Sequence, residues 1–230
     1  MILAVALVML SGTASAQENP APTGGSMGRR GAIEIGLRVA YAVPSGTLNG
    51  GTAAHHYPIE LTDEVKGMIP VEIDAGYRTT HFYVGLSYRY GFAFVNTSTN
   101  PASGAEDLRL GVNAQVHLAP GHPFDPWLGF GVGYEWLSSD ASGPLTNAAY
   151  YPPASGLELA NFQLGGDIAV ARHLAVGPFI GVSLGQYSNV GQHEVNEQQH
   201  QWLEFGLRGA FDATLDGLTW GRVGHLLFDR

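Results

Sequence analysis

The sequence contains no cysteine and a single lysine, Lys66, among its 230 residues. The absence of cysteine excludes disulfides, thiolate catalysis and cysteine-based zinc sites. The shortage of lysine and the formal charge of −9 argue against a nucleic-acid partner and against a basic membrane-surface patch. Only 13% of the residues are charged and 45% are hydrophobic, so the chain does not have the composition of a disordered protein.

The sequence also lacks the run of about 20 apolar residues that a transmembrane helix needs. Its one concentrated apolar stretch, Ile2 to Leu10, is followed by Ala14-Ser15-Ala16, the pattern of a cleaved secretory signal. We therefore predict a signal peptide over residues 1–16 and an exported protein; a short buried N-terminal helix is the alternative. Residues 17–30, rich in proline and glycine, are predicted to form a flexible linker.

Alternation of apolar residues with period two recurs eight times along the chain, whereas a helical period is hard to find. The alternating segments are 33–41, 69–77, 82–94, 108–118, 128–136, 162–170, 174–184 and 203–211. The breaks between them alternate in length: long polar stretches cover roughly 44–67, 95–106, 138–156 and 187–200, and short ones lie near 79–81, 119–126 and 171–173. Long loops at one end and tight turns at the other are typical of a membrane barrel. We predict an all-β fold over residues 31–212, an eight-stranded antiparallel up-and-down transmembrane β-barrel.

The second face of each predicted strand is small, polar or charged, and much of it is glycine. The interior of an eight-stranded barrel is just wide enough for side chains, so glycine there leaves volume for a few large charged groups. We predict that arginines and carboxylates pair in this lumen, because the planar guanidinium suits bidentate contact with a carboxylate. The predicted network comprises Glu34, Arg38, Glu72, Asp74, Arg78, Arg89, Asp107, Arg109, Glu135, Asp167, Glu204 and Arg208.

Aromatic residues of the apolar face gather near the predicted strand ends, as in the aromatic girdles of outer-membrane barrels. Tyr77, Phe82 and Phe211 lie on the short-turn side, and Tyr90, Phe92, Phe94, Tyr134 and Trp136 lie on the loop side. A soluble barrel with apolar residues inside is the alternative, but its water-facing sheet would carry many Lys, Glu and Thr residues in place of glycine.

Residues 71–91 are predicted to form a hairpin with a two-residue turn at Thr79-Thr80. In this register Arg78 faces His81, Glu72 faces Ser87, and Arg89 is the diagonal neighbour of Glu72. All of these side chains then point to one face of the sheet.

Other candidate chemistry is weaker. The segment 193-HEVNEQQH-200 resembles the zinc-protease motif HExxH, but Glu197 stands where the second histidine belongs. We expect it to lie in the last long loop, where a surface metal site shared with His55-His56 is an alternative to no metal site. Ser87 and Ser183 face the lumen without an evident histidine, so we expect no catalytic residues, no cofactor and no enzymatic activity.

Three segments carry a resemblance to a known group: 124-FDPWLGFGVGYEWL-137, 176-VGPFIGVSLGQY-187 and 202-WLEFGLRGAF-211. The chain from Gly31 to Phe211 resembles the small eight-stranded outer-membrane barrels of Gram-negative bacteria, of the OmpA/OmpX/OmpW type, and their uncharacterised outer membrane protein β-barrel relatives. The resemblance implies an outer-membrane location, contact with outer-membrane lipids and with the barrel-assembly machinery, and a monomer. It bears on fold far more than on activity.

The last strand of such proteins usually ends the chain on an aromatic residue. Phe211 takes that place, but further residues follow, and we predict that 213–230 form a C-terminal periplasmic tail.

Two roles fit the predicted fold. One is a structural or surface-interaction barrel whose lumen is closed by salt bridges, and the alternative is a small porin-like channel or a conduit for small or hydrophobic molecules.

Overall fold

The structure is a computed structural model that describes residues 31–49, 59–96, 104–139, 154–190 and 193–214. The predicted signal peptide (1–16), the linker (17–30) and all of the predicted tail beyond residue 214 lie outside the described residues. Within the described part, no helix is long and apolar enough to cross a membrane.

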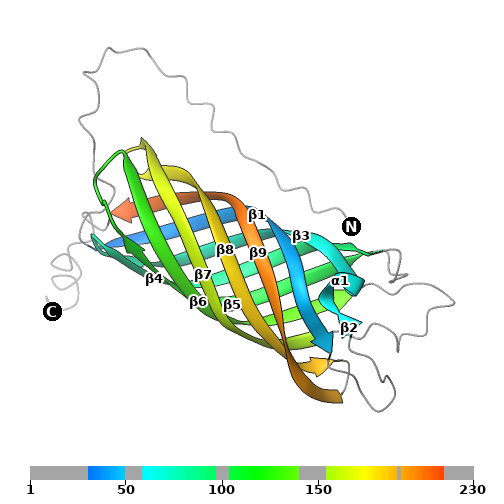
Figure 1. Cartoon of the computed structure of the whole chain (residues 1–230). Coiled ribbons are helices and arrows are strands. Elements are labelled where there is room, and N and C mark those ends of the chain that lie inside the picture. The colour runs from blue at the N-terminus through cyan, green and yellow to red at the C-terminus, as the bar shows by residue number, and fades with distance from the viewer. Residues whose placement is uncertain (1–30, 50–58, 97–103, 140–153, 191–192, 215–230) are drawn as a thin grey trace, which may run out of the picture.

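The described chain is almost entirely β-strand, and eight of its strands form the wall of a barrel (Figure 1). The wall strands are β1 (Ala32–Asn49), β3 (Val65–Arg78), β4 (Phe82–Val95), β5 (Ala105–His117), β6 (Phe124–Ser139), β7 (Ala154–Ala171), β8 (Leu174–Val190) and β9 (His193–Thr214). A two-residue strand, β2 (Ile59–Glu60), pairs with β1 and leads into the four-residue helix α1 (Leu61–Glu64).

Every wall strand pairs antiparallel with its neighbour in sequence, and the sheet closes on itself where β1 pairs with β9. The closing register runs from Ala32 opposite Thr214 to Gly46 opposite His200, so the seam is as long as the other pairings. Closure leaves the wall without an open edge, which is the arrangement that a bilayer demands of a sheet. The predicted eight-stranded up-and-down barrel is confirmed.

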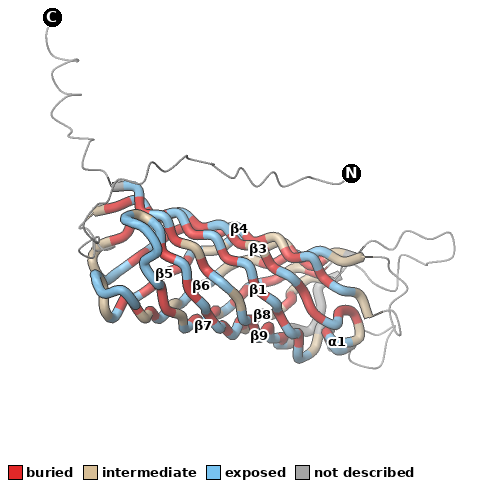
Figure 2. The backbone as a smooth tube through the Cα atoms, turned by 90° about the horizontal axis from the view of Figure 1, so that it is seen from above, coloured by how far each residue is buried: buried red, intermediate tan, exposed pale blue. Residues whose placement is uncertain are grey.

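Buried and exposed residues alternate along the strands (Figure 2). On the outer face, large apolar side chains have exposed fractions from 36% at Val182 to 71% at Leu86. The inner face holds the charged and amide side chains. The polar face therefore lines the lumen, and the alternative barrel with an apolar interior does not apply.

The strands run further than the alternation predicts, most clearly at β8 and β9. Residues 187–200 were expected to form a long loop, but β8 continues to Val190 and β9 begins at His193, with Asn189 opposite Glu194. The reason is that backbone pairing needs no apolar face once a strand has left the apolar band of the barrel. Sequence alternation therefore detects only the central part of each strand.

The β3–β4 hairpin has the predicted face but a different register. Its turn residues are Thr80 and His81, because the Phe82 amide donates to the Thr79 hydroxyl oxygen (3.0 Å) and the Thr79 amide donates to the Phe82 carbonyl (2.7 Å). Glu72 therefore lies directly opposite Arg89 and not diagonal to it. A shift of two residues moves every partner without changing which face a side chain occupies.

An apolar cluster closes the loop end of the lumen. It combines Leu61 of α1 with wall residues, and all of its members are buried. The members are Ala42, Leu61, Val65, Met68, Ala93, Leu137, Ala154, Tyr187 and Trp202. We call this group the apolar plug. The short helix, which the sequence did not predict, lies at the loop end of the barrel (Figure 1) and contributes the buried Leu61 to the plug.

Glycine on the inner face makes room for the large polar groups of the lumen. A Cβ atom on Gly36 would overlap with the Asp74 carboxylate, and one on Gly85 would overlap with the Tyr83 hydroxyl. The outward-facing Gly209 differs, since its nearest neighbour to an added Cβ is the Leu37 carbonyl oxygen at 4.0 Å.

These two environments predict different effects of the same substitution. We expect Gly36→Ala to lower the free energy of unfolding by about 1–3 kcal/mol, the usual cost of overpacking. Gly209→Ala, its matched control on the outer face, has room for the methyl group. Urea unfolding of both variants in detergent micelles, followed by tryptophan fluorescence, measures the difference. Equal unfolding midpoints would contradict the role assigned to the inner glycines.

A buried ion-pair network in the lumen as the candidate functional site

All twelve residues of the predicted lumen network are buried side chains on the inner face of the barrel. Arginines and carboxylates from distant strands meet there in two groups, one in the middle of the barrel and one near the short turns. Two of the twelve, Asp107 and Glu135, lie outside both groups.

The central group is built around Glu72, which is 2% exposed. Its carboxylate accepts from Arg38, from Arg89 Nε (3.0 Å) and from Arg109 Nη2 (2.6 Å). The Asn113 amide donates to the same carboxylate at 3.1 Å. One carboxylate on β3 thus ties together arginines from β1, β4 and β5.

The same three arginines bind further carboxylates. Arg38 also contacts Asp74 (2.9 Å), Arg89 forms a bidentate pair with Glu204, and Arg109 pairs with Glu158. These contacts extend the central group across the lumen to β7 and β9.

The short-turn group is built around Glu34 on β1. Arg78 Nη1 donates to Glu34 at 2.6 Å, and Arg208 pairs with the other oxygen of that carboxylate. Arg78 reaches on to Asp125 (3.2 Å), and Arg208 reaches on to Asp167 (2.5 Å). The guanidinium carbon of Arg208 also lies 5.3 Å from the ring centre of Trp127, whose indole donates to Asp167.

Glu135 has neutral donors and a histidine in place of an arginine. It accepts from Tyr187 Oη (2.5 Å) and Trp202 Nε1 (3.3 Å) and lies 3.2 Å from His200 Nε2. Tyr187 and His200 stack with ring centres 4.0 Å apart. Asp107 interacts with Glu135 and, at longer range, with Arg89 and Arg109, and it forms no ion pair within 4 Å with a described arginine. This set joins the central group to the apolar plug, which shares Tyr187 and Trp202 with it.

Several members of the lumen were not predicted, for identifiable reasons. The alternation changes phase at a register irregularity between Glu158 and Ala160, so Glu158 and Asn161 both point inward. Asp125 lies in the short break expected near 119–126 and Trp127 lies just beyond it, whereas β6 already begins at Phe124. His200 and Trp202 fell in or beside the expected loop. The missing signals were the strand boundaries and the irregularity within β7, and not the side-chain chemistry.

The arginines of the lumen come from one side of the wall. Arg38, Arg78, Arg89, Arg109 and Arg208 lie on β1, β3, β4, β5 and β9. In the described residues, β6 and β7 contribute carboxylate acceptors, and none of β6, β7 and β8 contributes an arginine. The guanidinium groups therefore reach across the lumen to Asp125, Glu158 and Asp167, and the crossing side chains fill it.

The eight residues of the predicted aromatic girdles lie on the outer face. Tyr77, Phe82, Phe92, Phe94, Trp136 and Phe211 are exposed. Tyr90 and Tyr134 are half-buried because each packs against its neighbour on the same face, Tyr90 on Phe92 (4.9 Å) and Tyr134 on Trp136 (4.6 Å).

The remaining candidates do not form a catalytic or metal site in the part of the chain that is described. Ser183 donates to Glu158 (2.6 Å), not to a histidine. His200 lies in a strand and is buried, which corrects its assignment to a loop. No group of three or more His, Asp or Glu side chains among the described residues is arranged to hold a metal ion. His55 and His56 lie outside the described residues.

The closed barrel with a polar interior and an apolar outer face has counterparts among solved structures. One is the outer membrane protein OprG from Pseudomonas aeruginosa, 12% identical, with a TM-score of 0.52 over 81% of this chain and 97% of that chain. Another is the outer membrane protein AlkL, determined in DMPC bilayers by solid-state NMR, 11% identical, with a TM-score of 0.51 over 87% of this chain and 98% of that chain.

No family model matches the chain, and no curated protein sequence matches it. At these identities the likeness concerns the fold alone. The chain has the fold of the small eight-stranded outer-membrane β-barrels.

Because three arginines share the Glu72 carboxylate, we can predict how its neutralisation changes the stability of the barrel. Glu72→Gln leaves Arg38, Arg89 and Arg109 buried and close together with one carboxylate fewer, and we expect it to lower the free energy of unfolding by about 3–5 kcal/mol. Glu106→Gln is the matched control, because Glu106 is exposed on the outer face. Urea unfolding in micelles tests the pair, and a Glu72→Gln variant as stable as its control would contradict the network.

Proposed function

We propose that this protein is an integral outer-membrane β-barrel without enzymatic activity, whose lumen is closed and whose role is structural or in surface interaction. One observation carries the proposal: side chains fill the lumen in three successive layers. These are the short-turn group around Glu34, the central group around Glu72, and the apolar plug at the loop end.

The outer face supports a position in a bilayer. Large apolar side chains between two sets of aromatic residues are exposed around the barrel, and burying them requires hydrocarbon. By the usual orientation of such barrels, the short turns face the periplasm and the longer connections face outward. Export through a signal peptide at 1–16, assembly by the barrel-assembly machinery and a monomeric state belong to this proposal.

The free-energy cost of separating buried ion pairs favours a closed lumen over a conducting one. Each lumen arginine is buried against at least one carboxylate, and separating such a pair exposes two charges inside a narrow pore. Breaking one buried pair by removing a partner typically costs about 3–5 kcal/mol. An open path requires several pairs to part together, and the apolar plug adds a layer that contains no ion pair.

A membrane barrel of this kind should resist unfolding by SDS until it is boiled. We expect the protein to be recovered in the membrane fraction and to migrate differently on SDS gels before and after boiling, because the closed hydrogen-bonded wall unfolds only on heating. A protein that is recovered in the soluble fraction and shows no shift would overturn the proposal.

Conductance separates a closed barrel from a channel. We expect purified protein in planar bilayers to show no large, steady conductance. Neutralisation of the central group in Glu72→Gln/Arg89→Gln should leave it closed, because the short-turn group and the apolar plug remain in series. Large, steady conductance of the unmodified protein would instead support the alternative, a small channel. Opening of the double variant alone would identify the central pair as a gate.

A further inference from the structure

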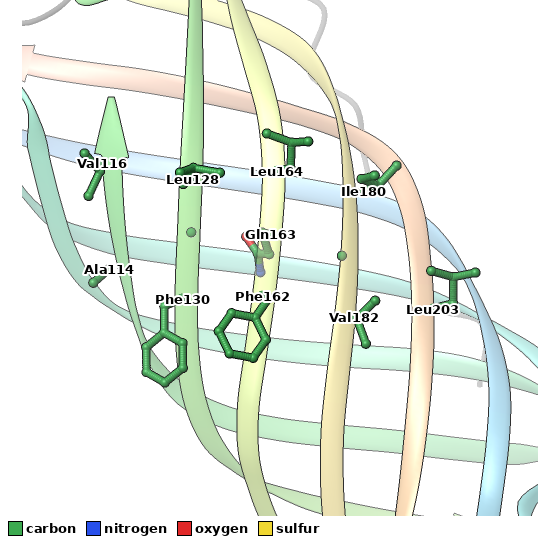
Figure 3. A pocket seen from close by; sticks show the side chains of 12 residues that line it. Ala114, Val116, Leu128, Phe130, Phe162, Gln163, Leu164, Ile180, Val182 and Leu203 are labelled. Carbon is green, nitrogen blue, oxygen red and sulfur yellow. The ribbon is translucent and has the colours of Figure 1, made fainter. Parts of the chain in front are cut away.

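The outer face carries a second feature that the closed lumen does not explain. A hollow of about 530 Å³ lies on the lipid-facing wall between β5 and β9 (Figure 3). All of the side chains that stand around it are aliphatic or aromatic, and its single polar neighbour, Gln163, is 5% exposed and points inward.

Strand register explains the shape of the hollow. Two rows of outward side chains run across neighbouring strands, each residue directly opposite the next. One row is Ala114, Phe130, Phe162, Val182 and Leu203, and the other is Val116, Leu128, Leu164 and Ile180. Between the rows lie the inward-facing Gly129, Gln163 and Gly181, so backbone forms the floor. We call this feature the outer groove.

The outer groove is oblique to the barrel axis and spans about one leaflet. It crosses four inter-strand spacings of about 4.8 Å, which gives a length of about 19 Å. Strands of such barrels tilt by about 35–45°, so a line across them rises by about 11–13 Å. One leaflet of a hydrocarbon core about 30 Å thick measures about 15 Å. The groove begins beside the short turns, since Val116 lies one residue before the end of β5, and it rises to Leu203 in the middle of β9.

We propose that the outer groove binds one acyl chain of a phospholipid from the leaflet on the short-turn side. The lining offers no charge to recognise another ligand, and the length fits a chain that runs from the interface towards the middle of the bilayer. At the end of the groove nearest the short turns, Val116 is paired with Phe82 of the aromatic girdle, and the lipid headgroup region lies at this level. The proposal rests on the membrane position proposed above.

Filling the groove tests the proposal against a matched change elsewhere. Ala114→Phe/Val182→Phe places two rings in the groove. Ala75→Phe/Val39→Phe places the same rings on the outer face of β3 and β1, away from it. Each variant is reconstituted with phosphatidylethanolamine, and native mass spectrometry counts the lipids retained when the detergent is removed. We expect one retained lipid for the unmodified protein and for the control, and none for the filled variant.

Folding is checked by the gel shift on boiling, and Ala114→Leu with Ala75→Leu replaces the phenylalanine variants if these do not fold. Equal retention in filled and control variants, or no retained lipid in the unmodified protein, overturns the proposal. A dimer mass that disappears on filling also overturns it, because the groove is then a contact between two copies. A protein that stays in the membrane fraction without retaining a lipid disproves the acyl-chain site and leaves the proposed function intact.

Trp127 provides a second readout that needs no filled variant. A Cβ atom on Gly129, in the groove floor, would lie 3.2 Å from Trp127 Cζ3, so the indole sits inside the wall beneath the groove. Phosphatidylethanolamine with bromine in the middle of its acyl chain should quench this indole at a low mole fraction. The quenching is obtained as the difference between the unmodified protein and Trp127→Phe. Quenching that only rises in proportion to the bulk fraction of brominated lipid would contradict a preferred site.

Discussion

The Glu72 carboxylate holds three arginines from three strands in the middle of the barrel, and most of the interior depends on contacts of this kind. Charges inside a narrow lumen lose much of their hydration, so each needs protein partners that replace water. An arginine can bind two carboxylates at once, which allows five arginines to serve seven carboxylates. The ion pairs that stabilise the buried charges also fill the lumen, so the stability of the barrel and the closure of its lumen have the same physical origin.

The outer and inner faces of the wall constrain each other. Eight strands enclose a lumen only as wide as a layer of side chains, so inner positions must alternate between large polar groups and glycine. Gly36 beside Asp74 and Gly85 beside Tyr83 illustrate this requirement. The apolar groups of the sequence are then left for the outer face, where only hydrocarbon can cover them. A composition poor in charge and rich in glycine follows from this division.

Much of this arrangement was predictable from period-two alternation. An error in strand register moves a side chain to the other face only when the strand is shifted by an odd number of residues. The twelve predicted lumen residues are buried for that reason, although the β3–β4 pairing is shifted by two residues. Alternation failed where local geometry breaks the period, as at the irregularity that turns Glu158 inward. It also failed at strand ends beyond the apolar band, where His200 belongs to β9, and it gave no sign of the helix that carries Leu61. Partner identities depend on barrel closure, which no local pattern encodes.

The asymmetry of the lumen connects these features. Arginines project from β9, β1, β3, β4 and β5, whereas β6 and β7 offer carboxylate acceptors to them and β8 carries no charged residue. The part of the wall formed by β6, β7 and β8 therefore needs few long inward side chains, and small inner residues such as Gly129 and Gly181 suffice there. Because Gly129, Gln163 and Gly181 point inward, only backbone lies between the two rows of outward side chains on the outer surface. The outer groove lies over these strands, so the charge pattern inside and the apolar hollow outside follow from the same distribution of residues.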